Sequence, residues 1–225
     1  MVRFRAASDQ AVLVYLGDEI ALAANERVLK LLRSLEKKPP KWLRNVQPAY
    51  CSLLVTFDAW QVAHEEVVGA LREYEARSEK MRATKRKTVK IPVCYDEEFG
   101  PDLREVAALR GMTPERVIQL HCSPIYHAYF LGFAPGFAYL GDLPEALATP
   151  RRESPRRRVS AGSVGIAGKQ TAVYPFATPG GWRLLGRTPT KMFRAGRIPG
   201  PLISIGDAVK FHPISREEFF ELERA

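Results

Sequence analysis

Residues able to bind an anion gather between Pro150 and Gln170. Two Pro-Arg pairs, Pro150-Arg151 and Pro155-Arg156, open this stretch. Proline fixes one backbone angle, so each arginine that follows it leaves the chain in a defined direction. The guanidinium group is a planar fork that matches a carboxylate or a phosphate. The pattern indicates an anion site or a partner-binding surface, with a solvated basic loop as the alternative.

The glycine-rich segment GSVGIAGKQ resembles a phosphate-binding loop only superficially. The Walker A motif has four residues between its first glycine and Gly-Lys, and then Ser or Thr. Here five residues separate Gly162 from Gly168, and Gln170 takes the hydroxyl position. The flanking residues also predict strands, which excludes a true P-loop. Lys169 and the glycine amides stay candidates for phosphate contact in another geometry, because backbone N–H groups can cradle an anion.

Patterns typical of nucleophilic or metal chemistry are weak in this sequence. There is no Gly-x-Ser-x-Gly elbow, and no histidine stands at an informative distance from Ser163. His121, Cys122 and His127 match no zinc-ligand spacing. Carboxylates available for acid–base work in this half are few, and Asp142 is expected to stabilise a turn: Asp142, Glu145, Glu153 and Asp207.

Aromatic side chains surround the same segment. They either line a pocket or pack in a core, and they are Phe133, Phe137, Tyr139, Tyr174 and Trp182. Gly180 and Gly181 precede Trp182 and let the backbone approach its neighbours closely. We therefore expect the Trp182 indole to lie at the rim of a site.

The sequence pattern of the elements that must position these residues changes near residue 95. Before residue 95, period-two and helical patterns alternate, and a strand near residues 88–94 would complete the ferredoxin-like order β-α-β-β-α-β. The alternative is that this domain exchanges or shares that last strand with the part of the chain that follows. The predicted strands are 12–16, 44–49, 53–57 and 88–94, and the helices are 19–36 and 60–74.

After residue 95 the sequence predicts two short helices and then many short strands. Strands separated by glycine and proline argue for a barrel or a sandwich. The helices are 102–110 and 114–121, and the strands are 125–131, 163–167, 171–174, 182–186, 203–205 and 208–212.

The net charge of +9 is concentrated in two clusters, residues 77–90 and 151–158. The first has no interleaved aromatics on which bases could stack, so it indicates a solvated linker and not a nucleic-acid site. The three cysteines are far apart, which favours a reducing cytoplasm over a disulfide framework. No apolar run reaches the length of about 18 residues typical of a membrane span, and the N-terminus lacks the apolar core of a secretion signal.

Four motifs closely resemble the allophanate hydrolase subunit 1 family. They are GFAPGFAYLG (132–141), ATPRRESPRRRVSAGSVGIAG (148–168), QTAVYP (170–175) and TPGGWRLLGRTP (178–189). The segments 91–107 and 205–214 match as well, so the resemblance covers nearly the whole chain. It implies an α+β chain with a ferredoxin-like domain at 1–90 and a cyclophilin-like β-barrel at 91–225.

The resemblance also implies a function. The family includes the B subunit of bacterial ATP-dependent 5-oxoprolinase, which works with companion subunits C and A to open a lactam, and the KipI-type inhibitor of a histidine kinase. Urea carboxylase and allophanate hydrolase carry related domains, which leaves a carboxyltransferase-like subunit as a third interpretation. For the enzyme, the resemblance implies ATP, with Mg²⁺ in the complex, as co-substrate, no metal site in this chain, and no membrane or nucleic-acid partner.

The substrate- or phosphate-binding candidates follow from the same resemblance. Arginine, Lys169 and glycine amides would supply positive charge, while Gln170, Thr171 and Thr188 would hydrogen-bond a small polar substrate. The full set is Phe133, Gly136, Phe137, Tyr139, Arg151, Arg156, Gly162, Ser163, Lys169, Gln170, Thr171, Tyr174, Gly181, Trp182, Arg187 and Thr188. Two departures from the family pattern, Ser160 in place of proline and Lys169 in place of a small or neutral residue, affect the geometry of this loop. No residue is assigned to proton transfer.

Overall fold

The computed structural model describes residues 2–81, 86–196 and 200–224. The chain divides into two compact units, Met1–Lys85 (unit 1) and Arg86–Ala225 (unit 2). The boundary falls shortly before the predicted one, because the strand that begins at Thr88 pairs entirely within unit 2.

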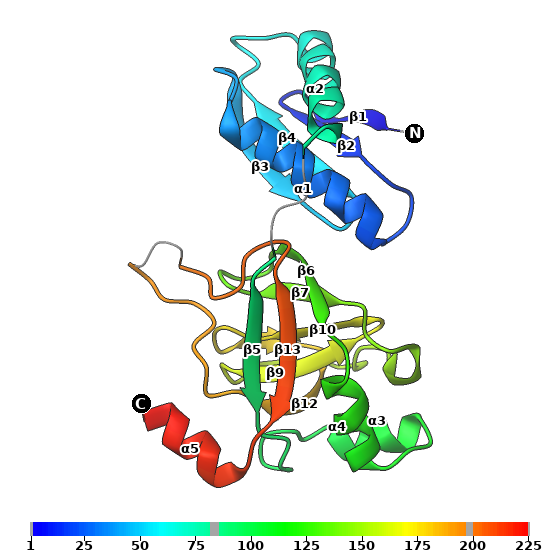
Figure 1. Cartoon of the computed structure of the whole chain (residues 1–225), viewed down its shortest axis with the longest axis vertical. Helices are drawn as coiled ribbons and strands as arrows, with labels where there is room; N and C mark the ends of the chain where they lie inside the picture. The colour runs from blue at the N-terminus through cyan, green and yellow to red at the C-terminus, as the bar shows by residue number, and fades with distance from the viewer. Residues whose placement is uncertain (1, 82–85, 197–199, 225) are drawn as a thin grey trace. The chain divides into compact units, whose positions relative to one another are not determined.

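Unit 1 is a four-stranded antiparallel sheet with two helices (Figure 1). Its strands are β1 (Arg3–Ser8), β2 (Ala11–Tyr15), β3 (Leu43–Pro48) and β4 (Ser52–Phe57), in the order β1-β2-β4-β3. Helices α1 (Leu22–Lys37) and α2 (His64–Glu79) pack against each other. The predicted alternation in β4 is confirmed, since Leu53, Val55 and Phe57 are buried and the residues between them are not.

The strand predicted at 88–94 does not complete this sheet; the alternative, that it pairs with the part of the chain that follows, is the one the structure shows. β5 (Thr88–Val93) pairs in parallel with a strand of unit 2, so unit 1 follows the order β-β-α-β-β-α. β1 takes the free edge beside β2 instead, and only Asp9 and Gln10 separate the two strands. Closing so short a turn orders few residues, so pairing β1 with β2 costs little conformational entropy. The sequence did not reveal β1, because most of its side chains are exposed and carry no apolar alternation.

Unit 2 is a seven-stranded sheet that curls into a nearly closed barrel. The order is β12-β9-β10-β7-β6-β13-β5, and β5 and β13 lie side by side in Figure 1. Cys94, just after β5, and Arg187 exchange two backbone hydrogen bonds of 2.9 Å, which bring the two edges of the sheet together. The strands not yet bounded are β6 (Tyr126–Leu131), β7 (Ala138–Gly141), β9 (Ser163–Ala167), β10 (Gln170–Val173), β12 (Arg183–Arg187) and β13 (Ala208–Pro213).

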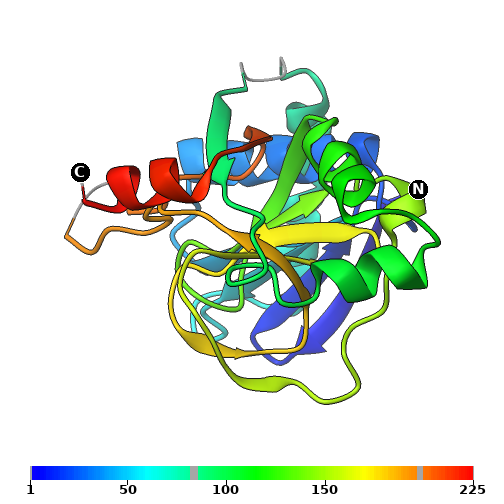
Figure 2. The same ribbon diagram turned by 90° about the horizontal axis from the view of Figure 1, so that it is seen from below.

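Smaller elements complete unit 2. A two-stranded ribbon joins β8 (Arg156–Val159) to β11 (Thr178–Gly180), and the helices are α3 (Leu103–Leu109), α4 (Pro114–Cys122), the short η1 (Glu145–Leu147) and α5 (Arg216–Arg224). Figures 1 and 2 together show α5 and the α3–α4 pair on opposite sides of one end of the barrel. The sequence missed β7, β8, β11 and α5. The strand expected at 203–205 is wrong: this segment is a turn into β13.

Helix α4 begins as the sequence predicts. The Thr113 hydroxyl accepts the Arg116 N–H at 3.3 Å, and Pro114 occupies the first turn. Gly111, just past α3, has φ +62°, as a helix-ending glycine requires.

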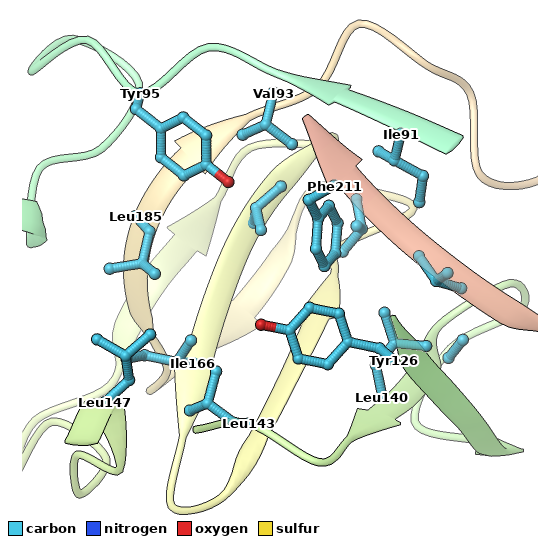
Figure 3. Close-up of a cluster of buried hydrophobic side chains, with 14 of the residues drawn as sticks. Ile91, Val93, Tyr95, Tyr126, Leu140, Leu143, Leu147, Ile166, Leu185 and Phe211 are labelled. Atoms are coloured by element: carbon cyan, nitrogen blue, oxygen red, sulfur yellow. The ribbon is translucent and has the colours of Figure 1, made fainter. Parts of the chain in front are cut away.

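The core of the barrel is filled by strand side chains and two tyrosines (Figure 3). Val93, Ile166 and Phe211 are completely or almost completely buried. Figure 3 shows the Tyr95 and Tyr126 hydroxyls among these apolar side chains. Each therefore needs an internal hydrogen-bond partner.

The basic stretch at 77–90 is only partly a linker. Arg77 belongs to α2 and pairs with Glu73, and Lys90 lies in β5. Residues 82–85 lie outside the described residues. All three cysteines carry free thiols. Among the described residues, every helix is too short or too polar to traverse a bilayer.

Candidate functional site

An arginine-lined cavity of about 260 Å³ lies in unit 2. We call it the arginine cavity. Its polar lining is Arg156, Arg158, Arg187, Ser160, Ser163 and Glu98, and its apolar lining is Phe99, Pro101, Val159 and Leu184. Three of the predicted candidates therefore meet here: Arg156, Ser163 and Arg187.

Three strands bring these side chains together: β8 carries Arg156 and Arg158, β9 carries Ser163, and β12 ends at Arg187. Arg156 and Arg158 are two residues apart in β8, so they project from the same face of the strand. Ser163 opens β9 directly after Gly162, whose φ is +81°. A Cβ at Gly162 would lie 2.3 Å from the Thr188 carbonyl oxygen, so only glycine allows this close passage.

The glycine amides expected to cradle phosphate are already used. The Gly162 N–H donates to the Tyr174 carbonyl at 2.7 Å, and the Gly168 N–H donates to the Thr149 carbonyl at 2.8 Å. Thr188 is buried, and its N–H donates to the Gly162 carbonyl at 2.9 Å. Gly162, Gly168 and Thr188 therefore hold the backbone path and offer no free donor of this kind.

Asp102 organises the wall of the arginine cavity. Its side chain is 2% exposed and accepts both Nη groups of Arg156, at 2.9 and 2.7 Å. It also accepts Arg152 Nη1 at 3.0 Å and the Leu184 N–H at 2.7 Å. A buried carboxylate with four donors holds its arginines in one geometry. The fork of Arg156 is thus fixed to Asp102 and is not free to grip a ligand in bidentate fashion.

The other two arginines of the cavity differ from each other. Arg187 Nε donates to the Ala161 carbonyl at 2.9 Å, its guanidinium lies 5.5 Å from the Phe219 ring centre, and Nη2 is 3.5 Å from Glu223. Arg158 is exposed and has no hydrogen-bond or ion-pair partner among the described residues. One arginine is therefore anchored and the other is available.

The aromatic candidates form a separate cluster on neighbouring strands. The Phe137 ring contacts those of Tyr139, Tyr174 and Trp182 at centroid distances of 5.0 to 5.6 Å. Trp182 is 5% exposed, so the expectation of an indole at a rim is wrong. Trp182 packs between other rings, as expected for an aromatic residue in a core and not for one that lines a pocket.

Two features of this aromatic cluster reach the surface. Phe133 is 61% exposed and has a φ of +68°. Burial raises the pKa of Tyr139 and of Tyr174, and the positive charge of Arg151 acts in the opposite direction on both. Arg151 therefore acts electrostatically on the two tyrosines, and it does not line the arginine cavity.

Two glycine candidates shape the chain around the same cluster. Gly136 has φ +83°, and a Cβ there would lie 2.8 Å from the Phe193 Cβ. Gly181 accepts the Arg152 N–H through its carbonyl at 2.8 Å.

Lys169 and Gln170 lie at the hairpin turn between β9 and β10. Strands on both sides of the glycine-rich segment confirm that it is not a P-loop. Lys169 Nζ is 2.6 Å from Glu145, and both side chains are largely exposed. This places Lys169 outside the arginine cavity.

Thr171 is inside the barrel, where it cannot meet a substrate from solvent. Its hydroxyl donates to the Gly165 carbonyl at 3.0 Å, so it accepts from His121 Nε2, 2.9 Å away. His121 Nδ1 is then the acceptor for the Tyr95 hydroxyl at 2.7 Å, which leaves Cys122 as donor to the Tyr95 oxygen at 3.2 Å. The donor and the acceptor of each hydrogen bond in the chain Cys122–Tyr95–His121–Thr171 are therefore determined.

Burial sets the charge of this network. His121 is completely buried, and desolvation lowers its pKa to about 3. Burial likewise raises the pKa of the Cys122 thiol and of the Tyr95 hydroxyl. The network is therefore neutral, and it belongs to the core.

Sequence reasoning missed Asp102, Arg158 and Ser160 as site residues. The signal for Asp102 was indirect: residues 151–158 hold five arginines and a single carboxylate, Glu153, so other parts of the chain had to supply counter-charges. No spacing rule could tell which carboxylate would do so.

Comparison with known proteins gives the chain its family. Residues 2–203 match the family model for the carboxyltransferase domain, subdomain C and D. The chain is 41% identical over 221 residues to the 5-oxoprolinase B subunit of Bacillus subtilis (strain 168), covering 94% of this chain and 92% of that protein. It is 40% identical over 205 residues to the 5-oxoprolinase B subunit of Escherichia coli O157:H7, covering 91% and 93%.

The chain belongs to the family of the carboxyltransferase subdomains C and D, with the 5-oxoprolinase B subunit among its members. Solved structures agree with this placement. The crystal structure of TTHA0988 superposes with a TM-score of 0.80 at 35% identity and covers 96% of this chain. This chain spans only 40% of TTHA0988, so the relative carries a further, larger part in the same polypeptide.

Proposed function

We propose that this chain is the B subunit of an ATP-dependent 5-oxoprolinase. The observation that carries the proposal is the identity of about two residues in five with two proteins of that name, across nearly the full length of each. A shared fold alone supports many functions, but end-to-end identity at this level also retains surface and loop residues.

The chemistry of the reaction suits an incomplete site. The lactam of 5-oxoproline is an unstrained amide, and transfer of a phosphoryl group from ATP to its carbonyl oxygen makes the carbon a better electrophile for water. Such a step needs positive charge where the phosphoryl oxygens lie. Arg158 and Arg187 supply positive charge in this chain, and no nucleophile–base pair stands beside them among the described residues.

The size of the arginine cavity bears on where ATP binds. Pockets for drug-sized ligands usually enclose about 300–1,000 Å³. At about 260 Å³ the arginine cavity suits a small anion better than a whole nucleotide. We place ATP and its Mg²⁺ on a companion subunit or at an interface with one, and we assign C and A as the companions, in the cytoplasm.

The finer fold assignment is part of the same proposal. The nearly closed seven-stranded sheet supports a cyclophilin-like barrel in unit 2. Unit 1 keeps the strand order of a ferredoxin-like sheet, with β1 in the edge position that a fourth strand would otherwise take.

Subunit omission tests the function directly. The chain is co-expressed with its companion candidates, and ATP-dependent formation of glutamate from 5-oxoproline is measured with each subunit left out in turn. Activity that requires this chain is expected. Full activity in its absence, or none from a well-folded complex, rejects the proposal.

A carboxyltransferase role is the second candidate, favoured by the description of the family model. It predicts carboxyl transfer that depends on a biotinylated partner. The same complex assayed with a biotinylated carrier and labelled bicarbonate separates the two. An inactive complex that instead inhibits a histidine kinase would point to the KipI-type role.

A further inference from the structure

We propose that the arginine cavity is an oxyanion-binding site, and that Arg158 and the hydroxyl of Ser163 are its ligand-contacting groups. The choice of 5-oxoproline as the ligand rests on the proposed function. The site itself follows from the charges, burial and unused donors around the cavity.

The charges around the cavity do not balance. Glu98 lines the cavity, but Arg216 holds it at 3.0 Å, and Glu223 is shared with Arg187. Arg152 and Arg183 both approach Glu105, while Asp102 receives Arg152 and Arg156. Six arginines thus face four carboxylates: Arg152, Arg156, Arg158, Arg183, Arg187 and Arg216 against Asp102, Glu105, Glu98 and Glu223. The local excess is positive, and Arg158 carries the part without a partner among the described residues.

Two serines without a side-chain hydrogen bond among the described residues line the same cavity. Ser163 is 4% exposed and lines the cavity, yet its hydroxyl has no hydrogen-bond partner among the described residues. The Ser163 hydroxyl oxygen is not itself fully buried, so a ligand in the cavity can reach it. Ser160 also lines the cavity, is exposed, and has no side-chain hydrogen-bond partner among the described residues. A ligand with acceptor oxygens would satisfy both.

Part of the lining is apolar. Phe99, Pro101 and Leu184 add apolar surface to the lining that the serines and arginines share. Phe99 is held by stacking on Phe219 of α5 at 4.4 Å between ring centres. A compact anion with a small hydrocarbon body, such as the five-membered ring of 5-oxoproline, matches a cavity lined by both charged and apolar residues.

Two sources could provide the oxyanion: the carboxylate of 5-oxoproline or a phosphoryl group. Binding to the full chain alone separates them. Ligand-observed NMR is recorded with 5-oxoproline, with 2-pyrrolidinone, which has the ring but no carboxylate, and with inorganic phosphate. We expect 5-oxoproline to bind and 2-pyrrolidinone not to bind. Phosphate binding without 5-oxoproline binding would keep the oxyanion site and assign it to a phosphoryl group.

Variants locate the binding. Arg158→Ala and Ser163→Ala should each weaken binding of the bound anion roughly tenfold, because each removes a donor to a charged oxygen. Arg157→Ala is the matched control: Arg157 is an exposed neighbour on β8 that does not line the cavity. Arg158→Lys should recover part of the loss. Melting curves establish that every variant is folded.

Two results would overturn the inference: no binding of either anion to the folded chain, or binding that Arg158→Ala and Ser163→Ala leave unchanged. Neither depends on turnover. An inactive complex in which this chain still binds the anion would reject the oxoprolinase role and leave the site standing.

Discussion

Unit 2 contains two buried polar networks that solve the same problem in opposite ways. The Asp102 network keeps its charges and surrounds one carboxylate with two arginines and a backbone N–H. The His121 network stays neutral and passes single protons from group to group inside the barrel. The Asp102 network reaches the arginine cavity, where positive charge is left uncompensated, while the His121 network carries no net charge. Unbalanced charge, more than burial of polar groups, distinguishes a candidate binding region from core.

The largest expected effect is loss of the Asp102 carboxylate. Asp102→Ala leaves Arg152 and Arg156 without their counter-charge and should lower the free energy of unfolding by about 3 kcal/mol. Urea denaturation measures the change. Glu97→Ala, which removes an exposed partner of Arg104, is the control and should cost under about 1 kcal/mol. Equal effects would mean that the Asp102 network is no more than a surface ion pair.

The neutral network should respond to pH instead. His121 has its pKa lowered from 6.5 to about 3 in the folded protein. The unfolded chain therefore binds a proton that the folded protein does not, and stability falls as the pH drops from about 6.5 towards 3. The slope should approach about 1.4 kcal/mol per pH unit from this group. Urea denaturation at several pH values gives the slope.

Two variants isolate the contribution of His121 to that slope. His121→Gln should remove it, whereas Thr171→Val should lower stability but keep it, because the histidine remains buried. A wild-type slope that persists in His121→Gln would show that carboxylates, not this network, control the acid response.

The smallest effect is expected at Lys169. Its pair with Glu145 is largely exposed, so Lys169→Ala should change stability by less than about 0.5 kcal/mol. Anion binding in the arginine cavity should also be unaffected. Loss of ATP-dependent activity in the assembled complex with this variant would restore Lys169 to the phosphate site and extend the charged region beyond the cavity.

Local patterns predicted much of the fold. The strand of residues 163–167 and the Thr113 cap are as expected, because alternation and capping depend on neighbours in sequence. β7 and β8 were missed, since each has only four residues, and in β8 three of them are arginines. The sequence left open which unit β5 joins, because its burial alternation is the same whichever partner strand it finds.

The site shows the same division. The sequence singled out residues 148–189 as the region of a site, and three candidates from it, Arg156, Ser163 and Arg187, share a cavity. Thr171 was misplaced, because strand alternation decides which face a residue occupies but not which face is the interior. Arg152 binds Asp102, whereas Arg151, one residue before it, has no bond to that carboxylate and does not line the arginine cavity.

The sequence by itself determined the family, the strand-rich second unit and the segment that carries the arginines. Glycine, proline and arginine encode local backbone paths and charge, and these are readable in order along the chain. Only the tertiary structure decided that Asp102, distant in sequence, would fix Arg156 and leave Arg158 without a partner among the described residues. Charge pairing acts through space, so which cation stays free depends on how β8, β9, β12 and α3 come together.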